Sequence, residues 1–372
     1  MPFVNSNSAL TRRLRALALL IVVALVAAAC GGSDEEAEPV EEEEAVAETT
    51  TTTTTTEAPY AGPWAPLTGL PAEAALLEEA AIMVKISNND SRSLAAQIGL
   101  ETADIVIEER IEASSTRFAA IFHSTLPTEL GPVRSARVTD LDLMRNLGTP
   151  LFLYSGGNAT VRSGLNSLVS QGEAVTVTDD GRGYLVRNDV DFNRPDNFFV
   201  DLNVVRADLG DTAGQATPVL SFLDEGETNF SIPTDGVGVT VRGRNVVSFV
   251  HYPERGYVRV QDGVIHTTRV GQPLIFDNIV VMETQYVPSA ADPASIDGIS
   301  VGQGSVSVLV NGERFEGIWD RPTAADPYRF VGNDGIEILL TPGQTWITMV
   351  PSGSYEFAVD EATQMVVLGD LG

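Results

Sequence analysis

The apolar positions of this chain fall into three zones that differ in spacing. An unbroken apolar run covers Leu17 to Ala29, and a polar zone follows between Ser33 and Pro63. After Trp64, apolar residues recur in short runs separated by polar turns, which is the pattern of a folded body. We therefore expect ordered structure to begin near Trp64 and to continue to the C-terminus.

The first half of this body alternates between two periodicities. Strands are predicted over residues 81–86, 103–111, 116–123 and 151–154. Helical spacing is found over residues 93–100, 140–147 and 160–170. Strands that alternate with helices favour an α/β layer up to about Thr212.

The second half consists mostly of short runs rich in β-branched and aromatic residues. These runs cover residues 237–241, 246–251, 257–260, 274–283, 305–310, 315–320, 336–340 and 345–350. Asp262-Gly263, Asn311-Gly312 and Asp334-Gly335 lie among them, and such pairs are strong hairpin signals. The sequence thus predicts a mainly antiparallel C-terminal part, a sandwich or an open barrel, and an α+β fold for the whole body.

The N-terminus has the features of an export signal. Arg12, Arg13 and Arg15 precede the apolar run, which is too short to span a bilayer comfortably. The following Ala27-Ala28-Ala29-Cys30 resembles a bacterial lipobox, although Leu is more usual than Ala27 at its position. This resemblance implies lipid attachment at Cys30 and a place on the extracytoplasmic face of the cell membrane. The alternative is a plain signal peptide or short anchor with a chance cysteine.

The resulting organisation has four segments. They are a signal peptide (1–30), an acidic and threonine-rich linker (31–63), an α/β N-terminal domain (64–212) and a β-rich C-terminal domain (213–372). The linker includes the threonine run Thr49 to Thr56 and has few apolar groups, so we expect it to be disordered. It serves as a spacer or, alternatively, as a carrier of O-glycans.

Charge and cysteine content exclude several classes of function. The formal net charge is -28, which disfavours binding to a phosphate backbone, so we expect no nucleic-acid partner. Cys30 is the only cysteine, and the three histidines, His123, His251 and His266, are not spaced as metal ligands. Thiol chemistry and a Cys/His zinc site are therefore not expected. We also expect no cofactor, and no catalytic residue or metal ligand can be assigned.

One group of charged residues is dense enough to suggest chemistry. It comprises three carboxylates and three arginines: Asp104, Glu108, Glu112, Arg117, Arg134 and Arg137. Asp104 and Glu108 are four residues apart on a predicted strand and so share a face. Neighbouring arginines bind phosphate or carboxylate through paired N–H donors, and nearby carboxylates can hold a cation or orient the arginines. The same residues could equally form ordinary ion pairs that fix a loop on the sheet.

Gly156 and Gly157 follow a predicted strand and precede a predicted helix. Such a pair lets backbone N–H groups approach a phosphate at a helix N-terminus. A plain turn is the commoner explanation.

Three further residues have two interpretations each. His123 ends a predicted strand and is either a base or a packed residue. Trp319 and Trp346 lie on separate predicted strands and form either a glycan-stacking platform or part of the core. A G-x-S-x-G nucleophile motif is absent from the sequence.

Several motifs of the body together identify a family. They are Gln97–Glu108 (Q-I-G-L-E-T-A-D-I-V-I-E), Thr116–Phe118, Gly131–Arg137 (G-P-V-R-S-A-R), Gly156-Gly157, Gly317–Trp319, Gly335–Ile338 and Pro342–Ile347 (P-G-Q-T-W-I). These motifs resemble those of the YerB-like lipoproteins, a domain-of-unknown-function family. Asp196 stands where that family usually has histidine in an Arg-Pro-His-Asn motif. The resemblance implies an α/β first part, a β-rich second part and export as a lipoprotein, but no reaction chemistry.

Two classes of function remain. The favoured one is a binding module of the cell envelope that recognises a wall polymer, a lipid head group or a protein partner. The other is an envelope enzyme that acts on a phosphate- or pyrophosphate-linked substrate through the arginines and carboxylates. The order of strand, strand, arginine loop and helix is similar at fold level to that of the LytR-CpsA-Psr phosphotransferases.

Overall fold

The computed structural model describes residues 61–372, apart from residues 225, 232, 291, 293 and 372. The predicted signal peptide, Cys30 and nearly all of the predicted linker lie outside these residues. No helix in residues 61–372, as far as they are described, is long and apolar enough to cross a membrane.

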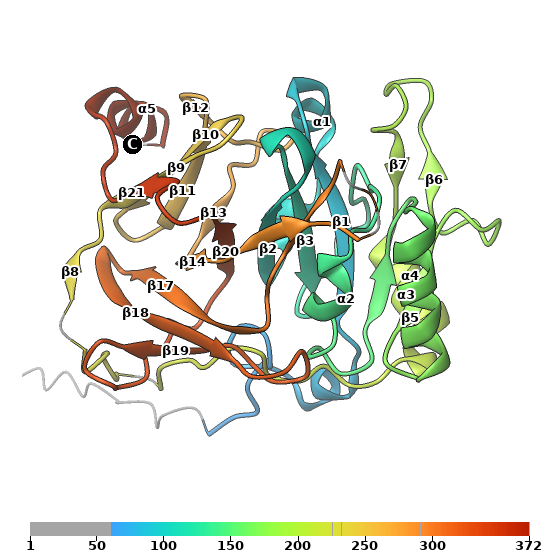
Figure 1. Cartoon of the computed structure of the whole chain (residues 1–372), viewed down its shortest axis with the longest axis horizontal. Coiled ribbons are helices and arrows are strands. Elements are labelled where there is room, and N and C mark those ends of the chain that lie inside the picture. Colours follow the sequence, from blue (N-terminus) through green and yellow to red (C-terminus); the bar gives the residue numbers. More distant parts are fainter. Residues whose placement is uncertain (1–60, 225, 232, 291, 293, 372) are drawn as a thin grey trace, which may run out of the picture. The chain divides into compact units, whose positions relative to one another are not determined.

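A mixed sheet with strands from both halves of the chain forms the centre of the α+β fold (Figure 1). From one edge to the other its order is β19 (Arg329–Gly332), β18 (Glu313–Arg321), β17 (Gly302–Val310), β14 (Asn278–Glu283), β20 (Thr345–Val350), β2 (Ile105–Arg110), β3 (Thr116–Phe122), β1 (Ile82–Asn88), β4 (Leu151–Leu153) and β5 (Val175–Val177), with β8 (Thr234–Asp235) paired to β18.

The two halves meet at β20. This strand is parallel to β14 on one side and to β2 on the other, and Ile347 lies opposite Ile107 of β2. All six residues of β20 are buried, as expected for a strand covered on both faces. The second half is mainly antiparallel, as predicted, but one of its sheets is shared, because β20 pairs with β2 of the first half.

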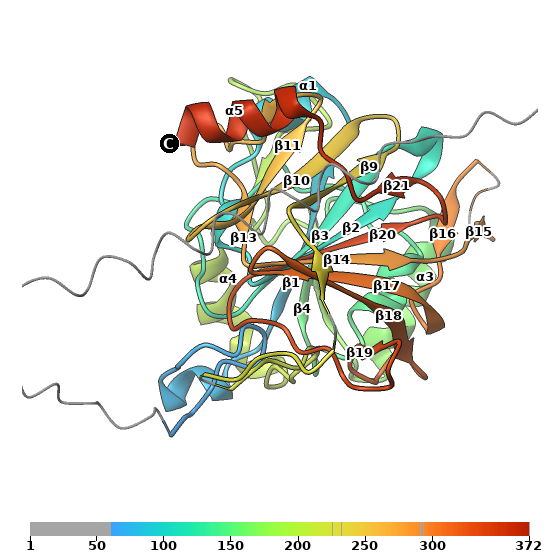
Figure 2. The same ribbon diagram turned by 90° about the vertical axis from the view of Figure 1, so that its left-hand side faces the viewer.

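A second sheet covers one face of the central sheet (Figure 2). It consists of β12 (Val264–Ile265), β11 (Gly256–Gln261), β10 (Val246–Tyr252), β9 (Gly238–Arg242) and β21 (Tyr355–Glu356), with β13 (Ile275–Phe276) paired to β11. Its inner face packs Phe249, Tyr257 and Phe276 into the core that contains Trp346. Its outer face packs Val250 and Val258 against Val367 of α5 (Glu361–Leu371).

Hairpins and helices complete the fold. The hairpins are β15 (Tyr286–Pro288) with β16 (Ile296–Gly298), and β6 (Val186–Arg187) with β7 (Phe198–Phe199). The helices are α1 (Ser91–Ala96), α2 (Thr139–Leu143), α3 (Ala159–Ser170) and α4 (Leu202–Leu209), with 3₁₀ turns η1 (Ala74–Glu78), η2 (Leu100–Thr102), η3 (Glu112–Ser114) and η4 (Gly210–Thr212).

Local sequence explains where these elements begin and end. Asp90, Asn158 and Asp201 cap α1, α3 and α4 by accepting backbone N–H groups of the first turn. α1 ends before the predicted residue 100, because Gln97 is extended and its neighbour Ile98 bridges to another segment. The predicted strand at 336–340 forms only single bridges.

The tryptophans of the second half belong to the core. Trp319 is buried, with its indole N–H donating to the Glu283 carbonyl, and Trp346 meets Phe118 and Phe276 edge to face. A glycan-stacking platform formed by Trp319 and Trp346 is therefore excluded in this structure, since neither ring is open to solvent.

Candidate anion-binding site

The alternation of β2 separates the predicted site residues onto two faces of the central sheet. Glu108 lies opposite Phe118 of β3, whereas Glu109 lies opposite Arg117. Because directly opposed residues point to the same side, Glu108 and Arg117 point to opposite sides. Asp104, four residues before Glu108, lies on the same side of the sheet as Glu108. The structure therefore does not bring these two carboxylates to the arginines.

Glu108 pairs with a residue that the sequence did not indicate. Both of its carboxylate oxygens accept from Nη2 of Arg259 in the second sheet, at 3.1 and 3.2 Å. The Arg259 guanidinium also lies over the rings of Phe118 and Trp346. Burial lowers the pKa of Arg259, and the Glu108 carboxylate opposes this shift. This pair holds the two sheets together.

Asp104 serves a local role at the start of β2. Its carboxylate accepts the backbone N–H groups of His123 at 2.5 Å and Ser124 at 2.9 Å. Burial raises the pKa of Asp104 to about 6, although these hydrogen bonds act against the shift. His123 is buried too, and desolvation lowers its pKa to about 4. Among the described residues, no group of three or more His, Cys, Asp and Glu could hold a metal ion.

Arg117 is the buried centre of an arginine cluster that also contains Arg134 and Arg137. Its guanidinium donates to the Ser135 carbonyl at 3.0 Å and to Oδ1 of Asn89 at 3.4 Å. It forms no ion pair with a carboxylate in the described part of the chain. Burial and the adjacent positive charges of Arg137 and Arg134 lower the pKa of Arg117 to about 9. The Glu112 and Glu109 carboxylates oppose this shift.

Arg134 and Arg137 extend from a loop that runs between β1 and the glycine pair. The backbone N–H of Arg134 donates to the Lys85 carbonyl of β1 at 2.8 Å. On the other side, the backbone N–H of Ser155 donates to the Arg134 carbonyl at 2.9 Å. The backbone N–H of Ala136 donates to the Gly156 carbonyl, also at 2.9 Å. The structure thus places two separately predicted features, the arginines and the glycine pair, side by side.

Both arginines are partly exposed, and each has an acidic neighbour. The Arg137 side chain is 16% exposed, and its Nη2 lies 2.5 Å from Glu112 Oε1. The Arg134 side chain is 13% exposed, and its Nε lies 3.7 Å from Asp196 Oδ1. Asp196 also accepts a hydrogen bond from the Ser87 hydroxyl at 2.7 Å. The position where the related family usually has histidine therefore carries a carboxylate that faces Arg134.

The glycine pair lies at the N-terminus of α3. Asn158 caps this helix by accepting from the Val161 N–H at 3.0 Å. A Cβ added to Gly156 would lie 3.3 Å from the Ser135 hydroxyl, a tight contact that a small shift of this side chain would relieve. Gly156 and Gly157 are partly exposed, and the N-terminal end of a helix favours anions.

Lys85, Glu109 and Asp140 lie beneath the arginine loop and were missed in the sequence. The Lys85 ammonium lies 2.5 Å from Glu109 and 2.7 Å from Asp140, and all three side chains are buried. Asp140 also accepts the Arg137 N–H at 2.7 Å, which fixes the loop. Burial raises the pKa of Asp140 to about 6, against the attraction of Lys85. The available signal was that the chain's only lysine interrupts an apolar strand.

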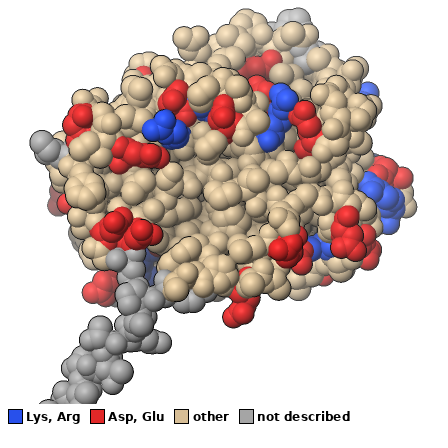
Figure 3. All heavy atoms as spheres, turned by 90° about the horizontal axis from the view of Figure 1, so that it is seen from below, with Lys and Arg blue, Asp and Glu red and all other residues tan. Residues whose placement is uncertain are grey.

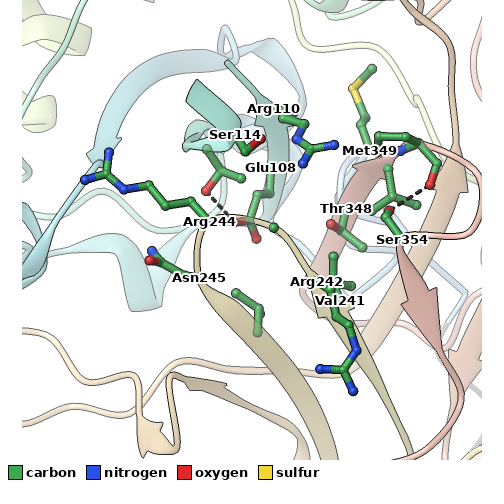
Figure 4. Close-up of a pocket in the computed structure, with 15 residues that line it drawn as sticks. Glu108, Arg110, Ser114, Val241, Arg242, Arg244, Asn245, Thr348, Met349 and Ser354 are labelled. Atoms are coloured by element: carbon green, nitrogen blue, oxygen red, sulfur yellow. Dashed lines mark hydrogen bonds between the residues drawn. The ribbon is translucent and has the colours of Figure 1, made fainter. Parts of the chain in front are cut away.

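A separate pocket lies on the Glu108 side, between β2 and the hairpin of β9 and β10 (Figure 4). It is lined by Arg110, Arg242 and Arg244, whose guanidinium groups point in three different directions (Figure 4). Its volume is about 40 Å³, which is space for about one water molecule. This pocket is too small for an organic ligand.

The two-part α+β fold, with a G-P-V-R-S-A-R loop at its arginine cluster, is that of a described protein family. Sequence models for a "Protein of unknown function (DUF3048)" match its N-terminal domain to residues 67–215 and its C-terminal domain to residues 237–347. The chain belongs to this family.

One relative has both a similar sequence and a solved structure. The "Putative lipoprotein YerB" of Bacillus subtilis is 30% identical over 301 residues, which cover 77% of this chain and 86% of the relative. The crystal structure of the YerB protein from Bacillus subtilis superposes with a TM-score of 0.66, at 27% identity over 79% of this chain and 99% of that chain. The resemblance inferred from the motifs is thereby confirmed.

Proposed function

We propose that this chain is an exported binding module, lipid-anchored through Cys30, that recognises an anionic group of the cell envelope. The anion is a phosphate or a carboxylate, bound by Arg134 and Arg137 beside the Gly156-Gly157 loop. The anchoring part rests on the export signal and on the printed name of the Bacillus relative, which calls it a lipoprotein. The ligand-binding part rests on the geometry of the arginines.

Arg117 is the observation that carries the ligand-binding part. A buried guanidinium is normally compensated by a carboxylate, because transfer of an unpaired charge from water is costly. Arg117 instead has a carbonyl and an amide oxygen as its hydrogen-bond partners, and two further arginines lie near it. The carboxylates of Glu112 and Glu109 act on Arg117 only from beyond ion-pair distance. A bound anion would give Arg117 and its arginine neighbours a directly bonded negative partner, which Arg117 lacks among the described residues.

The positions of the carboxylates favour binding over turnover. Phosphate transfer through this cluster would need an acid, a base or metal-holding carboxylates that face the ligand. Asp104 and Glu108 were the candidates, and they face the opposite side of the sheet. On the arginine side, Glu112 and Asp196 are engaged with Arg137 and Arg134, and Glu109 and Asp140 are engaged with Lys85.

The test is a thermal-shift and calorimetric titration of the full chain with inorganic phosphate, pyrophosphate, a glycerol phosphodiester and a wall-polymer fragment. A ligand that binds only the folded state stabilises it by about 2.7 kcal/mol at a hundredfold excess over Kd. We expect at least one of these anions to stabilise the wild type. We expect this shift to be lost in Arg134→Ala/Arg137→Ala.

A matched control separates loss of a ligand site from loss of two positive charges. Arg145 and Arg182 also have acidic partners, Glu173 and Asp180, but lie outside the cluster. The variant Arg145→Ala/Arg182→Ala should keep the anion response. If both double variants respond like the wild type, or if no anion shifts any of them, the cluster is structural. Release of phosphate from pyrophosphate, abolished only in the cluster variant, would instead establish the enzymatic alternative.

A further inference from the structure

We infer that a second surface, the apolar underside, rests on the interface of the membrane to which the chain is anchored. This surface comprises four exposed apolar side chains: Trp64, Leu70, Phe230 and Ile336. Phe230 is 79% exposed and Trp64 is 39% exposed, so large hydrophobic groups face water here. The inference rests on the proposed anchorage, but not on the proposed anion site.

Contacts connect the three chain segments that carry these side chains, which are residues 64–71, 222–230 and 336–340. Trp64 pairs with Pro71 in the first segment, where Gly69 abuts the ring of Phe222. Phe222 in turn forms a β-bridge with Leu340 in residues 336–340.

Residues 222–230 and 336–340 are joined by hydrogen bonds next to Phe230. The Asn229 side chain donates to the Leu339 carbonyl at 2.9 Å and accepts from its N–H at 2.8 Å. Ile336 lies three residues before Leu339, on the segment that Asn229 holds. The four apolar side chains therefore lie on connected segments.

The distribution of charge on this side of the molecule bears on what it can contact. Of 23 basic and 51 acidic residues, 3 and 10 precede residue 61, so the remainder of the chain has a net charge of -21. Figure 3 shows the molecule from below, the side on which β19 and the residues that follow Ala61 lie in Figure 1. Charged groups gather toward the rim of this face, and a broad central tract carries none (Figure 3).

The place where the chain enters the body selects the membrane as the occupant. The described residues begin at Ala61, three residues before Trp64. About 30 residues separate Ala61 from Cys30, and in any conformation they span at most about 100 Å. Lipid attachment at Cys30 would thus keep the body within that distance of the bilayer, with the tether joining it on the underside. A strongly acidic body can approach lipid head groups most easily through a face that carries few charges. Asp334, which accepts from the Ser231 hydroxyl at 3.1 Å, is an exposed acid on this surface, between Phe230 and Ile336.

The residue types suit the water–lipid interface. Tryptophan is enriched at that depth, where its ring is buried and its N–H remains hydrated. Phenylalanine and leucine provide the apolar area that inserts among the head groups. The occupant we propose is therefore the phospholipid interface itself, and not a protein partner.

Tryptophan fluorescence can test this contact directly. Of the three tryptophans, Trp319 and Trp346 are buried, so Trp64 alone can meet a quencher in lipid. The full lipidated chain is incorporated into phosphatidylcholine vesicles with or without brominated acyl chains. We expect brominated lipid to quench the emission of the wild type, and Trp64→Phe to abolish this quenching.

Variants and controls separate docking from anchoring. Phe230→Ser/Leu70→Ser should reduce the quenching severalfold, whereas Val190→Ser, at a residue 94% exposed on the loop between β6 and β7, should leave it unchanged. If the chain floats with the vesicles but Trp64 is not quenched, the docking inference fails and the anchorage stands. If the chain does not float, or floats equally well as Cys30→Ser, the anchorage itself fails. Shielding of Trp64 that requires added membrane proteins would also overturn a lipid contact.

Discussion

Replacement of Lys85 by methionine should be among the most destabilising single changes in the body. Methionine has a similar length but no charge, so the substitution leaves the Glu109 and Asp140 carboxylates buried without their ammonium partner. Both carboxylates lie within 2.7 Å of Lys85 Nζ, and neither is appreciably exposed. Removing one partner of a buried ion pair costs about 3–5 kcal/mol. We expect a loss of that size in urea unfolding at pH 8.

The pH dependence of this loss follows from the sign of the pKa shift. Burial already raises the pKa of Asp140 to about 6, and loss of Lys85 raises it further. An acid whose pKa is higher in the folded than in the unfolded state stabilises the fold when protonated. The deficit of Lys85→Met should therefore shrink as the pH falls from 8 to 5.

A surface ion pair provides the control for Lys85→Met. Arg145 contacts Glu173 at 2.7 Å, but both side chains are about one-third exposed. Arg145→Met should cost less than about 1 kcal/mol, because exposed pairs contribute little. A loss from Lys85→Met as small as that from Arg145→Met, or one that is equal at pH 5 and pH 8, would refute the reasoning.

Two further predictions concern the separate carboxylates. Asp104→Asn should be more stable than the wild type at pH 8 and lose this advantage by pH 4, because the pKa of Asp104 is raised from 3.8 to about 6. The difference in unfolding free energy should change by about 3 kcal/mol over this range. A difference that stays constant in thermal unfolding from pH 4 to pH 8 would contradict this prediction. Glu112→Gln should raise the affinity for the bound anion up to about fivefold by freeing Arg137, since such a pair is worth at most about 1 kcal/mol. Glu316→Gln, which breaks an ion pair of similar exposure, should leave that affinity unchanged in the same calorimetric titration.

Local patterns predicted most of the strands and helices, because each depends on residues close together in the sequence. The turns at Asp262-Gly263 and Asn311-Gly312 have the positive φ angles that those residue pairs allow. Asn311-Gly312 connects two predicted strands, whereas Asp262-Gly263 connects a predicted strand to the short strand β12, which was not predicted. The segment 336–340 was predicted as a strand from the same kind of pattern. There the apolar spacing reflects burial of Ile338 and Leu340 on an irregular segment.

The arrangement of the strands could not be read from local patterns. β20 lies between β2 and β14, and nothing near residue 345 encodes a partner more than two hundred residues earlier. The same applies to the site. Spacing along β2 showed that Asp104 and Glu108 share a face, but the pairing with β3 placed Arg117 on the other face. Arg259, the partner of Glu108, is 151 residues away in sequence.

The direction of β1 determines which part of the envelope the arginine cluster can reach. β1 runs from Ile82, near the end of the molecule where the chain enters, to Asn88, next to the residues that contact Arg117 (Figure 1). Its seven residues span about 20 Å. The arginine loop contacts β1 at Lys85, about 10 Å from Ile82. If the underside lies on lipid as inferred, the arginines would stand at least that far above the head groups, beyond the Debye length of about 8 Å at physiological ionic strength. They would then be screened from the bilayer's own charge, and the anion proposed for them would come from the surroundings of the protein rather than from the phosphates of the membrane beneath.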